Sequence, residues 1–268
     1  MARRARVDVE LVRRGLARSR HQAAELIDAG RVSIDGMPAA KAATAVAPTA
    51  RLAVDSVERS WVSRGAHKLT GALDAFRIDV TDSRCLDAGA STGGFTEVLL
   101  DRGAREVVAA DVGYGQLAWS LRTDQRVTVL ERTNVRALSV DAIGAPVDVV
   151  VADLSFISLT TVMAALASCA ADDADIVPMV KPQFEVGKDQ VGSRGVVGDP
   201  QLRAAAVLSV ARCAVGLGWH PVNVVASPLP GPSGNVEYFL HLRSRTDKPM
   251  EGDVLDQTVR RAVAEGPQ

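Results

Sequence analysis

The chain has 268 residues, of which 47% are hydrophobic, and this length suits one large domain together with one small domain. Its formal net charge of −1 gives no indication of a nucleic-acid partner. Three cysteines without a CxxC pattern disfavour a disulfide framework or a cysteine zinc site, and no segment approaches the ~18 apolar residues of a membrane span. We therefore expect a cytoplasmic protein without a metal and without stable membrane insertion.

The first part of the chain predicts two short helices and a β-hairpin, all within a small α+β domain. Apolar residues recur at helical spacing over residues 7–30. Ser19 opens the second helix, and Gln22 three residues later completes a capping box. Apolar and polar residues then alternate up to Asp35–Gly36, a dipeptide typical of hairpin turns.

Basic residues are concentrated at this end of the chain. The first twenty residues contain seven arginines, Arg13 among them, against Asp8 and Glu10. Guanidinium groups bind phosphate through paired hydrogen bonds, so the local charge favours RNA or phosphate contact over an ordinary solvated face, which stays the alternative. The arginines that we expect to bind RNA are Arg3, Arg4, Arg6, Arg14, Arg18 and Arg20.

The segment that runs from Val9 through Gly15–Arg20 to Asp35–Gly36 resembles the S4 domain, a module that binds structured RNA. We place this S4-like domain at residues 1–58. Residues 59–62 follow as a short linker, in which Trp61 is either a packing anchor or, less favoured, a platform for stacking bases.

The remainder, residues 63–268, alternates strands and helices, which predicts an α/β doubly wound domain. The fourth expected strand is a nearly continuous apolar run, as in a strand covered on both faces. The expected strands are 85–89, 107–111, 127–130, 147–152, 176–180, 222–226 and 236–242. One expected helix begins at residue 95, and two others span 155–170 and 202–217.

A glycine-rich loop follows the first of these strands. Glycines at this place allow the backbone to approach a ligand closely, and Asp111, about 20 residues after Gly89, is placed to accept hydrogen bonds from the ribose of a nucleoside cofactor. The Ser-Thr interruption and the preceding aspartate favour S-adenosylmethionine, and NAD stays open. We expect the cofactor to be bound by Asp87, Gly89, Ala90, Ser91, Thr92, Gly93, Gly94, Phe95, Asp111 and Asp153.

Charged residues stand at several strand ends, where α/β sheets bind ligands. Asp153 follows the fourth expected strand, Lys181 follows the fifth, Glu237 lies at the last strand, and Lys68 precedes the first. Each has a plainer interpretation. Asp153 could cap a helix that begins near Ser155, Lys181 could be a surface lysine, and the other two could be separate solvated charges.

Together these four residues resemble the Lys-Asp-Lys-Glu tetrad of FtsJ-type ribose 2′-O-methyltransferases. With the S4-like domain, the chain resembles the TlyA family of ribosomal RNA cytidine-2′-O-methyltransferases. This resemblance implies a Rossmann-like, seven-stranded catalytic domain, S-adenosylmethionine as cofactor, and ribosomal RNA of the small and often the large subunit as partner. It implies catalysis by Lys68, Asp153, Lys181 and Glu237, for which we expect Lys181 to be central.

The proposed chemistry suits these residue types, because a ribose 2′-hydroxyl is a poor nucleophile and needs alignment and help with its proton. Three other functions stay open: a non-catalytic ribosome-assembly factor, a membrane-active haemolysin, and an NAD-dependent oxidoreductase. The loop at residues 187–198 either folds over RNA or is a mobile surface loop. Neither the target nucleotide nor the oligomeric state is predicted.

Overall fold

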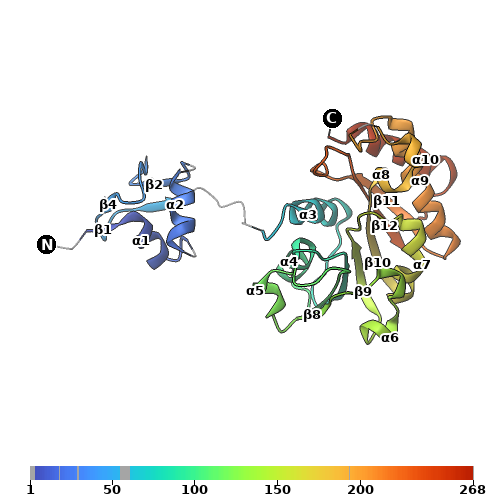
Figure 1. Cartoon of the computed structure of the whole chain (residues 1–268), viewed down its shortest axis with the longest axis horizontal. Helices are drawn as coiled ribbons and strands as arrows, with labels where there is room; N and C mark the ends of the chain where they lie inside the picture. Colours follow the sequence, from blue (N-terminus) through green and yellow to red (C-terminus); the bar gives the residue numbers. More distant parts are fainter. Residues whose placement is uncertain (1–3, 18, 29, 55–60, 193, 268) are drawn as a thin grey trace. The chain divides into compact units, whose positions relative to one another are not determined.

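The computed structural model describes residues 4–17, 19–28, 30–54, 61–192 and 194–267 (Figure 1). The chain divides into two compact units, residues 1–60 and residues 61–268, and each has its own hydrophobic core. The two units are therefore described separately.

The N-terminal unit is a small α+β domain. Its core is formed by apolar side chains of both helices and of the strands, among them Leu11, Leu26 and Val32. The amide of Gln22 donates to the Ser19 side chain at 3.2 Å, as expected of the capping box. The elements are β1 (Ala5–Arg6), α1 (Val7–Arg13), α2 (Arg20–Asp28), β2 (Val32–Ile34), β3 (Met37–Pro38), β4 (Ala45–Val46) and β5 (Leu52–Val54). Strands β3, β2 and β5 form one antiparallel sheet, and β1 pairs with β4.

The second unit is an α/β domain built on a seven-stranded sheet, which confirms the expected fold class. The strands lie in the order β11-β12-β10-β9-β6-β7-β8. The elements are α3 (Gly65–Phe76), β6 (Arg84–Ala88), α4 (Gly94–Asp101), β7 (Glu106–Ala110), α5 (Trp119–Arg122), β8 (Val127–Leu130), α6 (Val140–Ile143), β9 (Val147–Ala152), α7 (Leu159–Cys169), β10 (Ala170–Val180), α8 (Pro182–Glu185), α9 (Pro200–Gly216), β11 (His220–Ala226), β12 (Tyr238–Arg243) and α10 (Gly252–Glu265).

Helices cover both faces of this sheet (Figure 1). Because successive strand residues point to opposite faces, Val149 and Val151 of β9 pack toward α3, α4 and α5, whereas Val150 and Ala152 pack toward α7, α9 and α10. This two-sided burial explains why β9 is almost uninterrupted in apolar residues.

Strands β6 to β10 run parallel, and β12 is antiparallel to its neighbours β10 and β11. The carboxyl ends of β6, β9 and β10 therefore share one edge with the beginning of β12. Asp153 follows β9, Lys181 follows β10 and Glu237 directly precedes β12, so the topology brings all three to this edge.

Several boundaries differ from the sequence-based expectation. Helix α7 begins at Leu159 rather than near residue 155, because the Ser158 side chain accepts from the Thr160 amide at 3.2 Å and caps it there. Helices α3 and α10 were not predicted, and α3 carries Lys68. Trp61 packs against the hydrophobic core that contains α3 and α4.

Candidate active site

The glycine-rich loop leaves β6 in a conformation that requires glycine. Gly89 has φ +88°, and a Cβ atom there would lie 2.5 Å from the carbonyl oxygen of Asp153. The amides of Gly89 and Ala90 both donate to the carbonyl of Ala110, at 2.8 and 3.1 Å. The loop is therefore held between the ends of β7 and β9, with Ser91 and Thr92 at its exposed turn.

Asp87 lies beneath this loop and lines neither of the two clefts described below. The Thr96 hydroxyl donates to its Oδ2 at 2.7 Å, and Oδ1 has no hydrogen-bond partner among the described residues. Burial raises the pKa of the Asp87 carboxyl to about 7. Asp87 thus ties the strand to α4 and supports the loop from below, and its direct contact with the cofactor stays a prediction. Gly93 also lines neither cleft, since its Cα faces side chains of Leu117 and Leu121.

Asp111 joins the two loops that follow β6 and β7. Its Oδ2 accepts from the amide of Ser91 at 2.8 Å, and its Oδ1 accepts from the amide of Gly113 at 2.6 Å. Each carboxylate oxygen can accept a further hydrogen bond, so the group remains able to bind two hydroxyls.

Two adjoining clefts open along this edge of the sheet. One, of about 420 Å³, contains the four charged residues, and the other, of about 480 Å³, contains Asp111. They share Gly89, Ser91, Asp153 and Ser155, so one elongated ligand can extend from one into the other.

The second cleft has apolar walls suited to a flat base above a ribose-binding carboxylate. Val112, Val135 and Leu154 line it together with Asn134. The sequence analysis did not identify these residues, because isolated apolar residues after β7 and β8 carry no recognisable motif. These apolar walls, together with the Asp111 carboxylate, therefore suit a nucleoside-containing cofactor.

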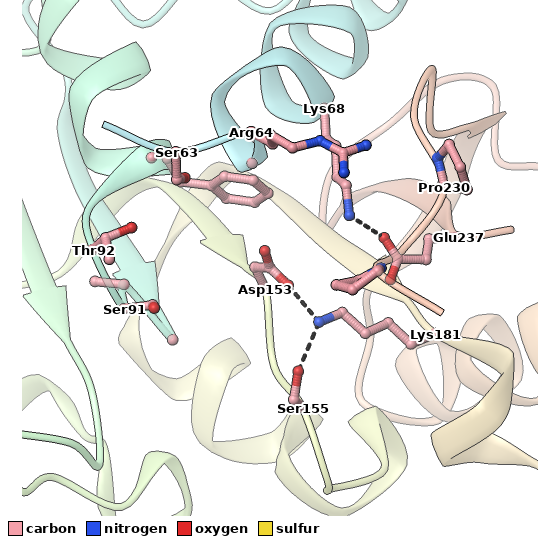
Figure 2. Close-up of a pocket in the computed structure, with 16 residues that line it drawn as sticks. Ser63, Arg64, Lys68, Ser91, Thr92, Asp153, Ser155, Lys181, Pro230 and Glu237 are labelled. Atoms are coloured by element: carbon pink, nitrogen blue, oxygen red, sulfur yellow. Dashed lines mark hydrogen bonds and ion pairs between the residues drawn. The ribbon is translucent and has the colours of Figure 1, made fainter. Parts of the chain in front are cut away.

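The four charged residues form two ion pairs in the first cleft (Figure 2). Lys68 Nζ lies 2.5 Å from Glu237 Oε2, and Lys181 Nζ lies 2.6 Å from Asp153 Oδ1. Lys181 Nζ also donates to Ser155 Oγ at 2.9 Å. Ser155 was not identified from the sequence, because it was expected to begin a helix.

Burial separates these pairs from ordinary surface charges. Lys68, Lys181 and Glu237 are 8%, 9% and 1% exposed. Buried lysines and carboxylates are rare unless they are paired, since each loses its hydration. The interpretation of Lys181 as a surface lysine and of Lys68 and Glu237 as separate solvated charges is therefore wrong. Because Ser158 caps α7, the capping role considered for Asp153 is also wrong.

The opening of this cleft is lined by residues from two further segments. Ser63 and Arg64 precede α3, and Pro230 and Pro232 lie in the turn before β12 (Figure 2). The turn is held to Glu237, whose carbonyl accepts from the amide of Ser227 at 2.8 Å. These residues were not predicted from the sequence.

The loop after α8 is held near the same turn. Asn235 Oδ1 accepts from the amide of Val197 at 3.0 Å, and Asn235 Nδ2 donates to the carbonyl of Gly195 at 2.8 Å. Lys188 and Arg194 in this loop are exposed and line neither cleft.

In the N-terminal unit, two buried carboxylates organise four of the arginines. Arg6 Nε and Nη2 donate to Asp8 at 3.0 Å each, and Arg20 Nη2 donates to Asp8 at 3.0 Å. The side chains of Arg6 and Arg20 stay 49% and 60% exposed. Hydrogen bonds from Arg6, followed by those from Arg20, lower the pKa of Asp8 to about 2 against the opposing effect of burial.

The second carboxylate, Glu10, binds Arg13 and Arg14, whose hydrogen bonds lower its pKa to about 2. Arg14 also donates from Nη1 to the carbonyl of Ala50 and from Nη2 to that of Pro48. All three of its nitrogens thus have partners inside the module, and its predicted RNA contact is not supported. Arg4 is exposed, whereas Arg3 and Arg18 lie outside the described residues.

Within the described ranges, no group of three or more His, Cys, Asp or Glu side chains is arranged to hold a metal ion. Over the same ranges, none of the helices combines the length and the apolar character that crossing a membrane requires.

Comparison with known proteins matches both units. Residues 61–244 match the FtsJ-like methyltransferase family, and residues 5–52 match the S4 domain. The chain is 72% identical, over the full length of both proteins, to "16S/23S rRNA (cytidine-2'-O)-methyltransferase TlyA" of Mycobacterium tuberculosis (strain CDC 1551 / Oshkosh). It is 35% identical to "23S rRNA (cytidine-2'-O)-methyltransferase TlyA" of Campylobacter jejuni, over 71% of this chain and 74% of that one.

Among solved structures, the "Putative hemolysin from Streptococcus thermophilus" covers 99% of this chain and 98% of its own, with a TM-score of 0.71 and 36% identity. The fold and the site define an FtsJ-like methyltransferase that carries an S4 domain. More particularly, the chain belongs to the TlyA family, which confirms the resemblance found in the sequence.

Proposed function

We propose that the protein is an S-adenosylmethionine-dependent ribosomal RNA methyltransferase that transfers a methyl group to the ribose 2′-hydroxyl of a cytidine, in the cytoplasm where ribosomes are found. The observation that carries the proposal is Lys181, whose ammonium lies between Asp153 and Ser155 where the two clefts join. The names of the relatives from M. tuberculosis and C. jejuni support cytidine ribose as the target.

The cofactor would be held by residues of both clefts. Asp111 would bind the ribose, the walls near Val112 and Val135 would hold the base, and the loop at Gly89 would lie along the amino-acid part. S-adenosylmethionine supplies a methyl group already activated by its sulfonium, so the protein has to align the acceptor and assist its proton.

Lys181 would act on the acceptor hydroxyl. An ammonium has three N–H donors; Ser155 receives one of them, and the Asp153 carboxylate lies beside the group as its ion-pair partner. A further N–H can be directed to the 2′-oxygen, where it would hold the hydroxyl and stabilise the negative charge that develops as the oxygen takes the methyl group and releases its proton to solvent water. The Lys68–Glu237 pair, across the same cleft, would position the nucleotide and balance the local charge.

This function is tested by labelling. Purified small and large ribosomal subunits, from cells that lack the protein, are incubated with the protein and S-adenosylmethionine carrying a labelled methyl group. Digestion to nucleosides is expected to release labelled 2′-O-methylcytidine, and assaying each subunit separately identifies which one is modified. Label found only on a base, or no label in either subunit, would contradict the proposal.

Replacing Asp111 by alanine is expected to weaken binding of S-adenosylmethionine and S-adenosylhomocysteine by about 10–100-fold, since a hydrogen bond to a charged group contributes roughly 1.5–3 kcal/mol. Isothermal titration calorimetry measures this change, and the melting temperature without cofactor controls for the lost loop contacts to Ser91 and Gly113. Tight NAD binding by the unchanged protein, without affinity for S-adenosylmethionine, would instead support an oxidoreductase.

Arg20 and Arg14 are expected to differ although both contact a buried carboxylate. Arg20→Ala should lower the affinity for ribosomal RNA by about tenfold, because Arg20 is exposed and can neutralise a phosphate. The slope of log affinity against log salt concentration should become smaller by about 1. Arg14→Ala should instead lower the melting temperature of the N-terminal unit by about 5 °C, because Arg14 joins α1 to two carbonyls. Filter binding and thermal unfolding distinguish these outcomes, and equal losses of affinity in both variants would contradict the assignment.

A further inference from the structure

A carboxylate outside the tetrad connects the two segments that carry Lys181 and its partners. Glu185 ends α8, the four-residue helix that begins directly after Lys181. Its Oε1 accepts from the amide of Leu159 at 2.7 Å, and its Oε2 accepts from the Ser158 hydroxyl at 2.6 Å. Both donors belong to the beginning of α7.

The same two segments are also joined inside the cleft. The segment between β9 and α7 carries Asp153 and Ser155, which hold Lys181 from the segment after β10. Phe156 and Phe184 add a third contact between these segments, with ring centroids 5.2 Å apart. Two sets of polar contacts therefore join the same two segments. Lys181 contacts Ser155 inside the cleft, and Glu185 contacts the beginning of α7 outside it.

This connection matters because neither segment contains a helix or strand long enough to hold it in place. Helix α8 is a single turn, which is too short to be stable alone. The preceding loop contains Phe156 in the left-handed region, with φ +64°, a conformation that a non-glycine residue keeps only when its surroundings enforce it. The Glu185 carboxylate provides two hydrogen bonds between them and lies at the N-terminus of α7, where negative charge is favourable.

Burial raises the pKa of Glu185, and the hydrogen bonds from Ser158 and Leu159 oppose that shift. The carboxylate lines neither cleft, so it is not placed against a ligand bound in them. We therefore look for its contribution in the residues it holds.

We propose that Glu185 is a positioning residue for methyl transfer: by tying α8 to the beginning of α7, it sets the place of Lys181 relative to Asp153 and Ser155. This inference rests on the proposed function, in which Lys181 acts on the hydroxyl. Small displacements of a catalytic group lower the rate strongly, by about 100-fold for 1 Å. The loss is expected in kcat, since the surfaces that bind RNA and cofactor are unchanged.

The test compares three variants of the full-length protein in methyl transfer to ribosomal subunits. Glu185→Ala is expected to lower kcat by about 10–100-fold, with KM for both substrates within about threefold of the unchanged protein. Glu185→Gln is expected to keep kcat within about threefold, because the amide oxygen can accept from Leu159 and the amide nitrogen can donate to the Ser158 oxygen.

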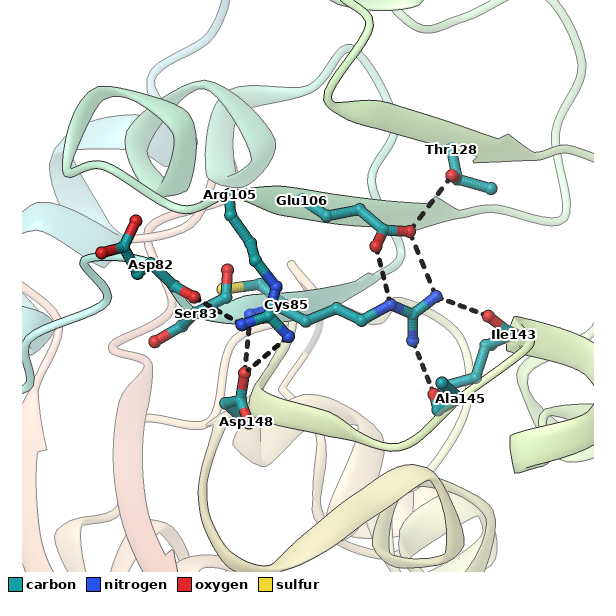
Figure 3. A network of polar contacts seen from close by, with 10 residues as sticks. Asp82, Ser83, Cys85, Arg105, Glu106, Thr128, Ile143, Ala145 and Asp148 are labelled. Atoms are coloured by element: carbon teal, nitrogen blue, oxygen red, sulfur yellow. Dashed lines mark hydrogen bonds and ion pairs between the residues drawn. The ribbon is translucent and has the colours of Figure 1, made fainter.

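Glu106→Ala serves as the matched control. Glu106 is the first residue of β7, so it lies at the amino ends of the parallel strands, away from the clefts. There it accepts from Arg84 Nε at 2.9 Å and from Arg84 Nη2 at 3.2 Å (Figure 3). Its removal also deletes a carboxylate that joins two segments, so it should lower the melting temperature without changing kcat per folded molecule. If Glu185→Ala is too unstable to assay, Ser158→Ala removes one of the two hydrogen bonds together with the cap of α7, and kcat per folded molecule should show a smaller loss.

Two further measurements separate the outcomes. Glu185→Ala introduced into the Lys181→Ala variant should cause no additional loss of kcat, because the residue to be positioned is gone. If Lys181→Ala retains normal turnover, the proposed function itself fails. If Lys181→Ala is inactive but Glu185→Ala keeps the kcat of the unchanged protein, or if its loss also appears in Glu106→Ala, the positioning role is overturned.

Discussion

Replacement of Lys181 by alanine is expected to lower the turnover of methyl transfer by about 10²–10⁴-fold, the range typical of general acid–base assistance. Lys181 has two partners in the cleft, the ion pair with Asp153 and the hydrogen bond to Ser155, and these hold its ammonium at the wall of the cleft. Affinity for the cofactor should change little, because in the proposed function its main contacts would come from Asp111 and the walls of the second cleft. The measurement is single-turnover methyl transfer with saturating cofactor and RNA.

Two controls address the chemistry of this step. Lys181→Arg should not restore turnover, since guanidinium stays charged and has a different shape. An RNA with 2′-deoxyribose at the target nucleotide should accept no methyl group from the unchanged protein, because the acceptor oxygen is missing. Near-normal turnover by Lys181→Ala, or transfer to the deoxy substrate, would exclude the ribose mechanism.

Removal of residues 1–58 is expected to lower the affinity for ribosomal RNA by on the order of 100-fold or more, while affinity for S-adenosylmethionine stays within about threefold. The basic side chains Arg4, Arg6 and Arg20 are exposed in the N-terminal unit and would be lost together. The catalytic unit should remain folded, since its two hydrophobic clusters contain no residue of the removed segment. RNA binding is measured by fluorescence anisotropy and cofactor binding by calorimetry.

Salt dependence adds a second test of the same surface. Neutralisation of phosphates releases counterions, so the RNA affinity of the full chain should fall steeply as salt is raised, and the truncated protein should show a smaller slope. Thermal unfolding of the truncated protein controls for loss of structure. Equal affinity and equal slope in the two proteins would show that the arginines form only a solvated surface.

The arrangement of the tetrad shows how far sequence patterns extend. Asp153 and Lys181 could be predicted to lie close together, because both follow parallel strands whose ends share an edge. Glu237 and Lys68 were assigned through the family resemblance, since no local pattern connects them. Only the tertiary structure joins these two residues, 169 positions apart in the chain, and gives Lys181 a second partner in Ser155.

The arginines show the same limit. Their number predicts a basic module, but Arg14 and Arg20 are equivalent as sequence. The folded module distinguishes them, because the carbonyls of Pro48 and Ala50 occupy Arg14, whereas Arg20 stays exposed beside Asp8. The partners of a guanidinium group are residues distant in the chain, and the spacing of apolar residues in the sequence does not predict them.

The sequence by itself determined the strands of the seven-stranded sheet along the chain, the glycine-rich loop before Asp111, and membership of the family. These depend on short-range properties: the alternation of apolar residues, the backbone freedom of glycine, and contiguous motifs. The tertiary structure decided the start of α7 at Leu159, the supporting place of Asp87 beneath the loop, and the contact of Glu185 with Ser158. Each of these depends on hydrogen bonds between segments that only packing of the sheet and its helices brings together.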